Sequence, residues 1–214
     1  MYSTVSVISP PAAEPVSLQV LQEHARIDYD YDNTLLGLYL TGARQAVEQF
    51  LGRVLITQTL RWVMAHQTPI NQFPLVPFTA YIFPMWMPYS MLFQRPIELP
   101  RAPVQAINSI SVGEWGKADT VLSADQYSAD LLTDPGRVRL HAGVATLPSD
   151  HISIEFVAGY GNDGTSVPVP IQLAILMMAT FLYEHRGDDG GDMPDAVKNL
   201  LWPYRLYTFG DPDA

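Results

Sequence analysis

The chain has 214 residues, of which 48% are hydrophobic and 16% charged, and its net charge is −10. Such a length suits one elaborated domain or two small ones, and so charge-poor a surface favours an oligomer. An acidic chain with twelve Lys and Arg residues is unsuited to gripping nucleic-acid phosphates, and the absence of cysteine excludes disulfides and thiolate zinc sites.

The first segment, residues 1–16, carries small residues and prolines, and we expect it to be an N-terminal arm. It lacks the basic and apolar regions of a secretory signal, so we expect an intracellular protein. Ser17 can cap a short helix, Leu18–Arg26. The run Asp28–Asn33 has the spacing of the start of a calcium loop but lacks its glycine and glutamate. The alternative is a connector in which Asp32 or Asn33 caps the next helix.

The second expected helix is Thr34–Leu51, whose apolar residues recur at helical spacing and which Gly52 ends. After it the apolar period changes from helical to alternating over Ile56–Met64. Alternation with β-branched and aromatic residues predicts a strand.

An uncharged insert, residues 67–94, combines several prolines with methionines and aromatic residues. Prolines would break the backbone hydrogen bonds of a membrane helix, so we do not favour membrane insertion. Aromatic and methionine side chains dominate protein interfaces. The insert is therefore interpreted either as a loop that docks on a protein partner or as a lid over the chain's own core. The candidate partner-docking residues are Phe78, Tyr81, Phe83, Trp86, Tyr89 and Phe93.

Beyond the insert, alternating patterns and turn signals predict the strands Val104–Val112, Val121–Leu122, Tyr127–Leu132, Arg137–Leu140 and Ile152–Ala158. Ile171–Tyr183 is a helix that is apolar on nearly every face, with Pro168 and Pro170 at its start. A last helix, Pro194–Leu201, is expected to be capped near Asp192 or Met193 and closed by Pro203. Helices that bracket a run of strands indicate an α+β fold.

Sequence motifs for catalysis are absent: there is no nucleophile elbow, phosphate loop, dinucleotide fingerprint or H-E-x-x-H motif. The five histidines share no metal-ligand spacing. The cluster Asp188, Asp189 and Asp192 could hold a cation or could be a solvated loop. We therefore expect neither a catalytic site nor a cofactor.

The order of these segments resembles that of the head–tail connector (adaptor) proteins of long-tailed bacteriophages and gene transfer agents. The similarity covers most of Val16–Phe209, apart from the insert. The stretches that carry it are VSLQVLQEHARID, DNTLLGLYLTGARQAVEQFLGRVLITQTLRW, IELPRAPVQAINSISV, GRVRL, ISIEFVAGYG, VPVPIQLAILMMATFLYEHR and PDAVKNLLWPYRLYTF.

The resemblance implies a homo-oligomeric ring, commonly of twelve subunits, in the virion neck and assembled in the host cytoplasm. Such a ring lies beneath the portal protein, extends the DNA channel and receives the stopper or tail-completion protein. It is neither an enzyme nor a membrane protein. The residues that match the family's C-terminal pattern, and that are candidates for portal docking, are Trp202, Pro203, Tyr204 and Arg205.

Combining the two arguments, we expect a helical connector core formed by residues 17–66 and 165–187, with an N-terminal helix pair and a C-terminal apolar helix. Residues 67–164 form a β-rich elaboration and residues 188–214 a C-terminal arm. A nearly all-apolar helix suits packing between subunits. Its candidate subunit-packing residues are Ile171, Ile175, Met178 and Leu182. Another neck or tail completion protein is the main alternative, and a metal-dependent enzyme is a further one.

Overall fold

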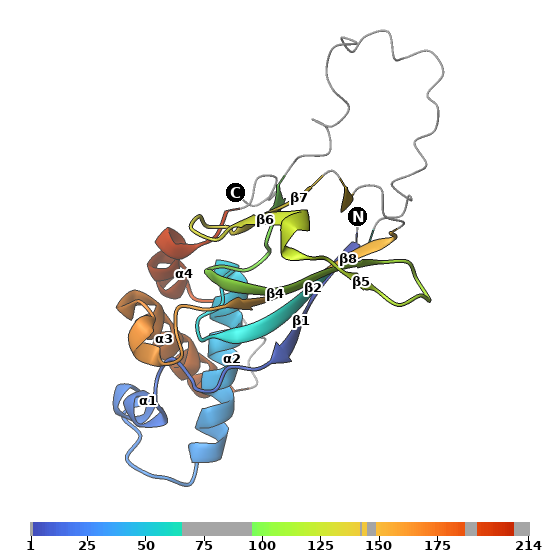
Figure 1. Ribbon diagram of the computed structural model, residues 1–214. Helices are drawn as coiled ribbons and strands as arrows, with labels where there is room; N and C mark the ends of the chain where they lie inside the picture. Colours follow the sequence, from blue (N-terminus) through green and yellow to red (C-terminus); the bar gives the residue numbers. More distant parts are fainter. Residues whose placement is uncertain (1, 66–95, 142, 145–148, 187–191, 208–214) are drawn as a thin grey trace, which may run out of the picture. The chain divides into compact units, whose positions relative to one another are not determined.

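The computed structural model describes residues 2–65, 96–141, 143–144, 149–186 and 192–207 (Figure 1). The fold is mixed α+β, as the sequence predicts. The chain divides into a helical unit (Pro10–Gln58, Arg101–Pro103 and Ala158–Ala214) and a β unit (Met1–Ser9, Thr59–Pro100 and Val104–Val157). Among the described helices, none is both long and apolar enough to cross a membrane.

Local signals place the helices of the helical unit. Helix α1 (Leu18–Ala25) begins where the Ser17 hydroxyl accepts a hydrogen bond from the Val20 amide at 3.3 Å. Helix α2 (Asn33–Leu51) ends at Gly52, whose φ of 67° lies in the left-handed region that glycine adopts without strain. Helix α3 (Val169–Glu184) follows Pro168 and carries a second proline in its first turn.

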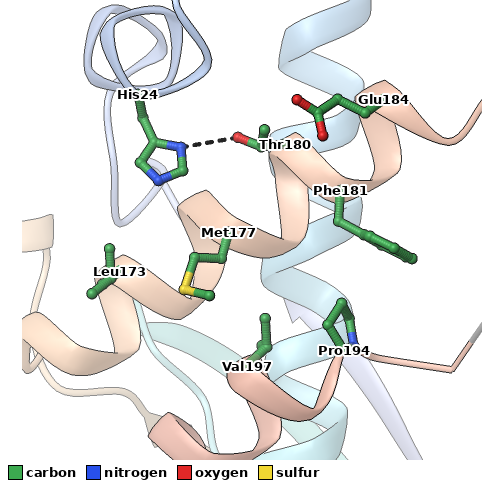
Figure 2. Close-up of a pocket in the computed structure, with 8 residues that line it drawn as sticks. All are labelled: His24, Leu173, Met177, Thr180, Phe181, Glu184, Pro194 and Val197. Carbon is green, nitrogen blue, oxygen red and sulfur yellow. Dashed lines mark hydrogen bonds between the residues drawn. The ribbon is translucent and has the colours of Figure 1, made fainter.

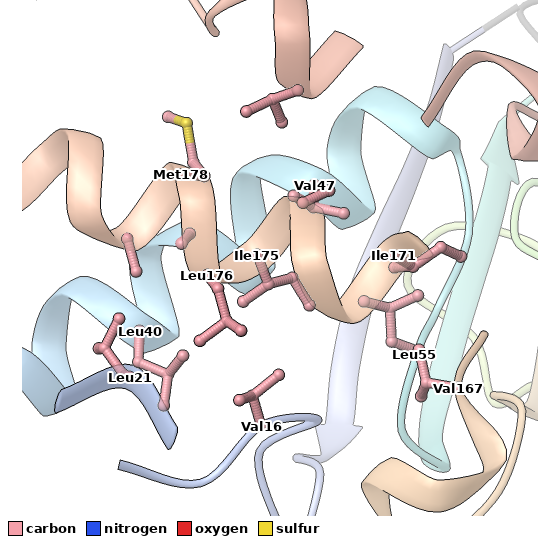
Figure 3. Close-up of a cluster of buried hydrophobic side chains, with 14 of the residues drawn as sticks. Val16, Leu21, Leu40, Val47, Leu55, Val167, Ile171, Ile175, Leu176 and Met178 are labelled. Atoms are coloured by element: carbon pink, nitrogen blue, oxygen red, sulfur yellow. The ribbon is translucent and has the colours of Figure 1, made fainter. Parts of the chain in front are cut away.

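The hydrophobic core of the helical unit lies where α2 and α3 pack along each other (Figure 3). Leu36, Val47 and Leu51 of α2 and Ile171 and Ile175 of α3 are fully buried there. Burying each such side chain contributes roughly 1.5–3 kcal/mol. Helix α1 contributes Leu21, and helix α4 (Asp195–Leu201) contributes Val197 and Leu201.

The start of α4 differs from the prediction. Its N-cap residue is Pro194, without a side-chain hydrogen bond, so the expected cap at Asp192 or Met193 was wrong. Nor does Pro203 end the helical path directly, since it lies inside the 3₁₀ turn Trp202–Tyr204 that continues α4. The reason is geometric: a proline needs no backbone donor in the first turn of such a segment.

In the β unit, a five-stranded sheet has the order β1-β2-β8-β4-β5. Its strands are β1 (Tyr2–Ser9), β2 (Gln58–Ala65), β8 (His151–Ala158), β4 (Val104–Gly113) and β5 (Thr120–Val121). Strand β1 pairs antiparallel with β2, with Tyr2 opposite Ala65 and Val7 opposite Leu60. Residues 2–9, which the sequence placed in an N-terminal arm, are therefore an edge strand, because β2 satisfies their backbone hydrogen bonds.

A second sheet of the β unit has three strands in the order β3-β7-β6, namely β3 (Ile97–Glu98), β7 (Arg137–Leu140) and β6 (Tyr127–Asp130). Leu99 and Val138 are fully buried. Strand β6 ends two residues earlier than predicted, because the Asp130 carboxylate accepts hydrogen bonds from the Leu132 amide and the Thr133 hydroxyl, both at 3.1 Å. Such an aspartate turn takes the chain out of the strand.

The boundaries between the two units also differ from those expected. Residues 59–65 continue strand β2 and belong to the β unit, whereas the sequence grouped them with the helices. Residues 101–103 and 158–164 belong to the helical unit instead of the β-rich elaboration. Short backbone pairings explain this: the Val54 amide donates to Ala102 at 2.9 Å and the Thr57 amide to Gly161 at 2.8 Å.

Candidate interaction surface

The candidate portal-docking residues lie together with aromatic residues from elsewhere in the helical unit. Trp202 is 53% exposed, and its ring centroid is 6.5 Å from that of Phe50 and 6.3 Å from that of Tyr207. The Arg205 guanidinium carbon lies 5.5–5.8 Å from the centroids of all three rings. We call Phe50, Trp202, Arg205 and Tyr207 the C-terminal aromatic cluster. A guanidinium over aromatic rings is a favourable cation–π arrangement.

Backbone hydrogen bonds fix this cluster to the end of α2. The Leu206 amide donates to the Leu51 carbonyl at 2.8 Å, and the Arg53 Nε donates to the Tyr204 carbonyl at 2.7 Å. Leu206 is buried against Gly52, where a Cβ would lie 3.4 Å from the Leu206 Cβ. The buried Leu206 therefore anchors the segment that carries the exposed residues Trp202 and Tyr207. Pro203 is also exposed, next to Trp202.

The cluster has the composition of an interface anchor. Tryptophan, tyrosine and arginine are the residues that most often dominate binding energy, and such anchors need a rigid support. Sequence analysis found Trp202 and Arg205 from the C-terminal pattern but missed Phe50 and Tyr207. Only the tertiary structure brings Phe50, at the end of α2, beside Trp202.

A buried ion-pair network stabilises the middle of α2. Arg44 is 6% exposed; its Nε lies 2.7 Å from Glu14 and its Nη1 lies 2.8 Å from Glu48. Glu48 also accepts a hydrogen bond from the Leu55 amide at 3.0 Å. Burial raises the pKa of Glu48, an effect that the Leu55 amide and Arg44 oppose. Both charged side chains of α2 are thus used within the chain.

Asp32, in the aspartate run before α2, makes side-chain hydrogen bonds within the chain. The Tyr183 hydroxyl donates to Asp32 Oδ2 at 2.7 Å, and Arg186 Nη2 lies 3.4 Å from the same oxygen. Hydrogen bonds with Tyr29 and Asp32 raise the pKa of Tyr183. Asp32 occupies the N-cap position, as expected, but its side chain binds α3 instead of capping α2. No group of three metal-ligating side chains occurs among the described residues.

The predicted subunit-packing residues of α3 differ in how deeply they are buried within their own chain. Ile171, Ile175 and Met178 are buried in the core of their own chain, and Leu182 is half-buried against it. The opposite side of α3 lines an apolar groove of about 460 Å³ (Figure 2). Its residues come from three helices: His24 of α1, Leu173, Met177, Thr180, Phe181 and Glu184 of α3, and Pro194 and Val197 beside and in α4. Sequence analysis missed this groove, because an all-apolar helix gives no sign of which side is left open.

In the β unit, a polar pocket of about 310 Å³ opens beside strands β2, β8 and β4. His151 Nε2 lies 3.1 Å from Asp119, and the His151 ring stacks on Trp115 with centroids 4.6 Å apart. The Ser111 hydroxyl donates to Asp119 at 3.3 Å. A catalytic serine must lie within hydrogen-bond reach of its base. Here the Ser111 hydroxyl is bound to the Asp119 carboxylate instead of the histidine, so these three residues lack the serine–histidine hydrogen bond of a triad.

The six aromatic residues of the insert and the acidic residues Asp188 and Asp189 lie outside the described residues. Their roles stay predictions from the sequence.

Comparison with known proteins gives two positive findings. Residues 15–115 match the family described as phage gp6-like head–tail connector protein. No curated protein matches the chain. Among solved structures, a chain in the neck of an empty gene transfer agent (GTA) particle, computed with C6 symmetry, has a TM-score of 0.68 at 20% identity. That alignment covers 97% of this chain and 98% of the other.

A chain from the virion of a native GTA particle has a TM-score of 0.66 at 20% identity, with coverage of 97% and 98%. A chain in the neck of a native GTA particle, computed with C12 symmetry, has a TM-score of 0.64 at 21% identity and coverage of 99% of both chains. The fold of this chain is thus similar to that of chains found in GTA particles. The resemblance drawn from the sequence is thus confirmed: residues 15–115 match the head–tail connector family, and the fold is similar to that of chains in GTA necks.

Proposed function

We propose that the chain is a head–tail connector (adaptor) that forms a ring in the neck of a phage or gene transfer agent particle. The observation that carries the proposal is the match over almost the whole of both chains with neck chains of such particles, together with the family match at residues 15–115.

In this proposal the helical unit is the connector core and the β unit is its elaboration. One of the similar neck structures was computed with twelve-fold symmetry, and this supports a ring of twelve copies. The ring lies beneath the portal and is assembled in the host cytoplasm. It receives the stopper or tail-completion protein on its other side.

The C-terminal aromatic cluster is the proposed portal contact. Trp202, Pro203, Tyr204 and Arg205 match the family's C-terminal pattern, and the exposed Trp202 is supported by Phe50 and Leu206. An exposed tryptophan on a rigid base is the type of residue that anchors an interface. The insert at residues 67–94 is a second proposed contact, with an unidentified neck partner.

The proposed ring also continues the DNA channel. The chain's net charge is −10, and an acidic lumen offers DNA no sites at which phosphate counterions would be released. We therefore propose that lumen-facing side chains are mainly Asp and Glu. A strongly basic bore in the surface potential of the assembled ring would overturn this part of the proposal.

Cryo-electron microscopy of the neck of purified particles tests the function directly. The expected result is density for this chain as a closed ring between the portal and the tail. Density at another level of the neck or tail would favour a completion or terminator protein instead. Absence of the chain from the particle would overturn the proposal.

A further inference from the structure

The outward face of α2 carries no charge. The helix has 19 residues, and its two charged residues, Arg44 and Glu48, are both turned into the buried ion-pair network. The exposed residues are Thr34, Leu38, Gln45 and Gln49. Leu38 is 67% exposed. The outer face of a solvated helix ordinarily carries charged side chains, so this face has the composition of a surface that is covered.

Gly42 lies on the same face, one turn after Leu38. A Cβ at Gly42 would meet no atom of the described residues within 4 Å, so packing within this part of the chain does not require glycine there. Glycine destabilises a helix interior relative to alanine. Leu38 is a protruding apolar side chain on this face. Gly42, which has no side chain, lets the backbone of another helix approach closely beside it.

The groove beside α3 is the complementary feature. Leu173, Met177 and Phe181 follow one another at intervals of four residues along its length, between α1 and α4 (Figure 2). The one carboxylate among the lining residues is Glu184, at the C-terminal end of α3. The groove is therefore apolar over most of its length and could accept the uncharged side of a helix.

These two faces point in opposite directions. Helices α2 and α3 pack on each other through the core residues of Figure 3, such as Val47 and Ile175. At 3.6 residues per turn, Leu38 lies on the far side of α2 from that core, and Met177 lies on the far side of α3. A ring built from one kind of subunit needs two different, complementary faces on opposite sides of each subunit.

We infer that Leu38 and Gly42 of α2 in one subunit pack into the α3 groove, at Leu173, Met177 and Phe181, of the next copy of this chain. This inference rests on the proposed ring and names the surfaces that close it. The occupant is a second copy because the uncharged face of α2 and the apolar groove beside α3 lie on opposite sides of one helix pair, the arrangement that a head-to-tail ring requires. Each copy carries a net charge of −10, so contact through faces with little charge also keeps repulsion between neighbouring copies low.

Cross-linking tests the contact, since the chain contains no cysteine. Particles are prepared with the double variant Leu38→Cys/Leu173→Cys and treated with a short bis-maleimide. The expected result is a ladder of multiples of the chain on a denaturing gel. Each single variant gives no ladder, because a groove cysteine then meets only a native leucine. Particles whose neck contains the ring but gives no ladder would overturn the inference and leave the proposed function standing.

Opposite charges provide a second test. Leu38→Glu and Leu173→Lys are each expected to reduce the amount of ring in particles at least tenfold, and the double variant is expected to restore most of it. Leu132→Glu, at a fully exposed leucine of the β unit, is the matched control and should change nothing. Equal defects in the single and double variants would show that these faces do not meet. Absence of the wild-type chain from the neck would instead overturn the proposed function itself.

Discussion

The outward surfaces of the two units differ in where their charged side chains form ion pairs and in which apolar side chains they expose. On the β unit, Arg61 pairs with Glu155, Asp119 with His151, and Lys117 with Glu114. The helical unit also has partly exposed ion pairs, Arg186 with Asp32 and Lys198 with Asp195, but the charged side chains of α2 are turned into the interior. Uncharged side chains such as Leu38 and Leu173 are left on the outer faces of α2 and α3. The β unit also exposes apolar residues: Val7 and Ile8 are neighbours on β1, and Trp115, Val121 and Leu132 lie on other strands and turns.

Single exposed apolar residues are normal on protein surfaces, whereas an apolar groove and an uncharged helix face mark interaction sites. Among the described residues, the exposed apolar side chains of the β unit are of the first kind. Those of the helical unit include the second kind, and this is where we propose contacts with the portal and with neighbouring copies. Paired substitutions in the two units test this difference.

The largest expected effect is that of Arg44→Leu. This substitution removes the only cation that pairs with Glu14 and Glu48 within the described network. Removing one partner of a buried ion pair costs roughly 3–5 kcal/mol. Denaturant unfolding of the free chain should show a loss of this size. A loss below about 1 kcal/mol would mean that the network contributes no more than a surface ion pair.

Ile175→Ala should cost roughly 2–5 kcal/mol, because it leaves a cavity in the core of the helical unit. Its matched control is Leu38→Ala on the outer face of α2, which should change the stability of the free chain by less than about 0.5 kcal/mol. The measurement is the unfolding midpoint of both variants under the same conditions. A large loss for Leu38→Ala would show that Leu38 is already buried in the free protein.

Trp115 and Trp202, which are exposed among the described residues, allow a matched comparison of binding. Trp202→Ala should weaken binding to the portal protein by about 2 kcal/mol, or roughly 30-fold, as expected for an interface anchor. Trp115→Ala, at a tryptophan of the β unit that is 64% exposed, should leave that affinity unchanged. Calorimetric titration of each variant with purified portal protein measures the effect. Equal losses for both variants would contradict a portal contact located at the C-terminal aromatic cluster.

The smallest expected effect belongs to Arg61→Ala. Arg61 pairs with Glu155 on the β unit, but its side chain is half-exposed, and exposed ion pairs contribute about 0.2–1 kcal/mol. Unfolding of this variant beside Arg44→Leu compares an exposed ion pair with a buried one. A loss for Arg61→Ala as large as that for Arg44→Leu would show that the β-unit surface also depends on buried charge.

Much of the fold could be predicted because its signals are local. Ser17 caps α1, Gly52 ends α2 and Pro168 precedes α3 at the positions that the sequence indicates. The alternation in β2 also predicts which residues are buried, namely Gln58, Leu60, Trp62 and Met64. Each of these features depends on residues within one or two turns or on the two-residue period of a strand.

Strand partners were not predictable in the same way. Residues 2–9 contain no signal for an edge strand beyond their β-branched residues, and β2, which completes their hydrogen bonds, begins at Gln58. The order β1-β2-β8-β4-β5 likewise joins segments from opposite ends of the chain. A single sequence carries no record of such pairings, because they depend on which edges meet after the chain collapses.

The sequence by itself determined the approximate positions of α1, α2, α3 and β2, the apolar character of α3, and the resemblance to head–tail connectors. Tertiary structure decided which side of α3 packs in the core and which side lines the groove. A helix that is apolar on every face does not indicate which face its neighbours will cover. It also placed Phe50 beneath Trp202 and turned Arg44 and Glu48 inward. Which surfaces remain for partners is decided by packing, since only packing determines which side chains are already satisfied within the chain.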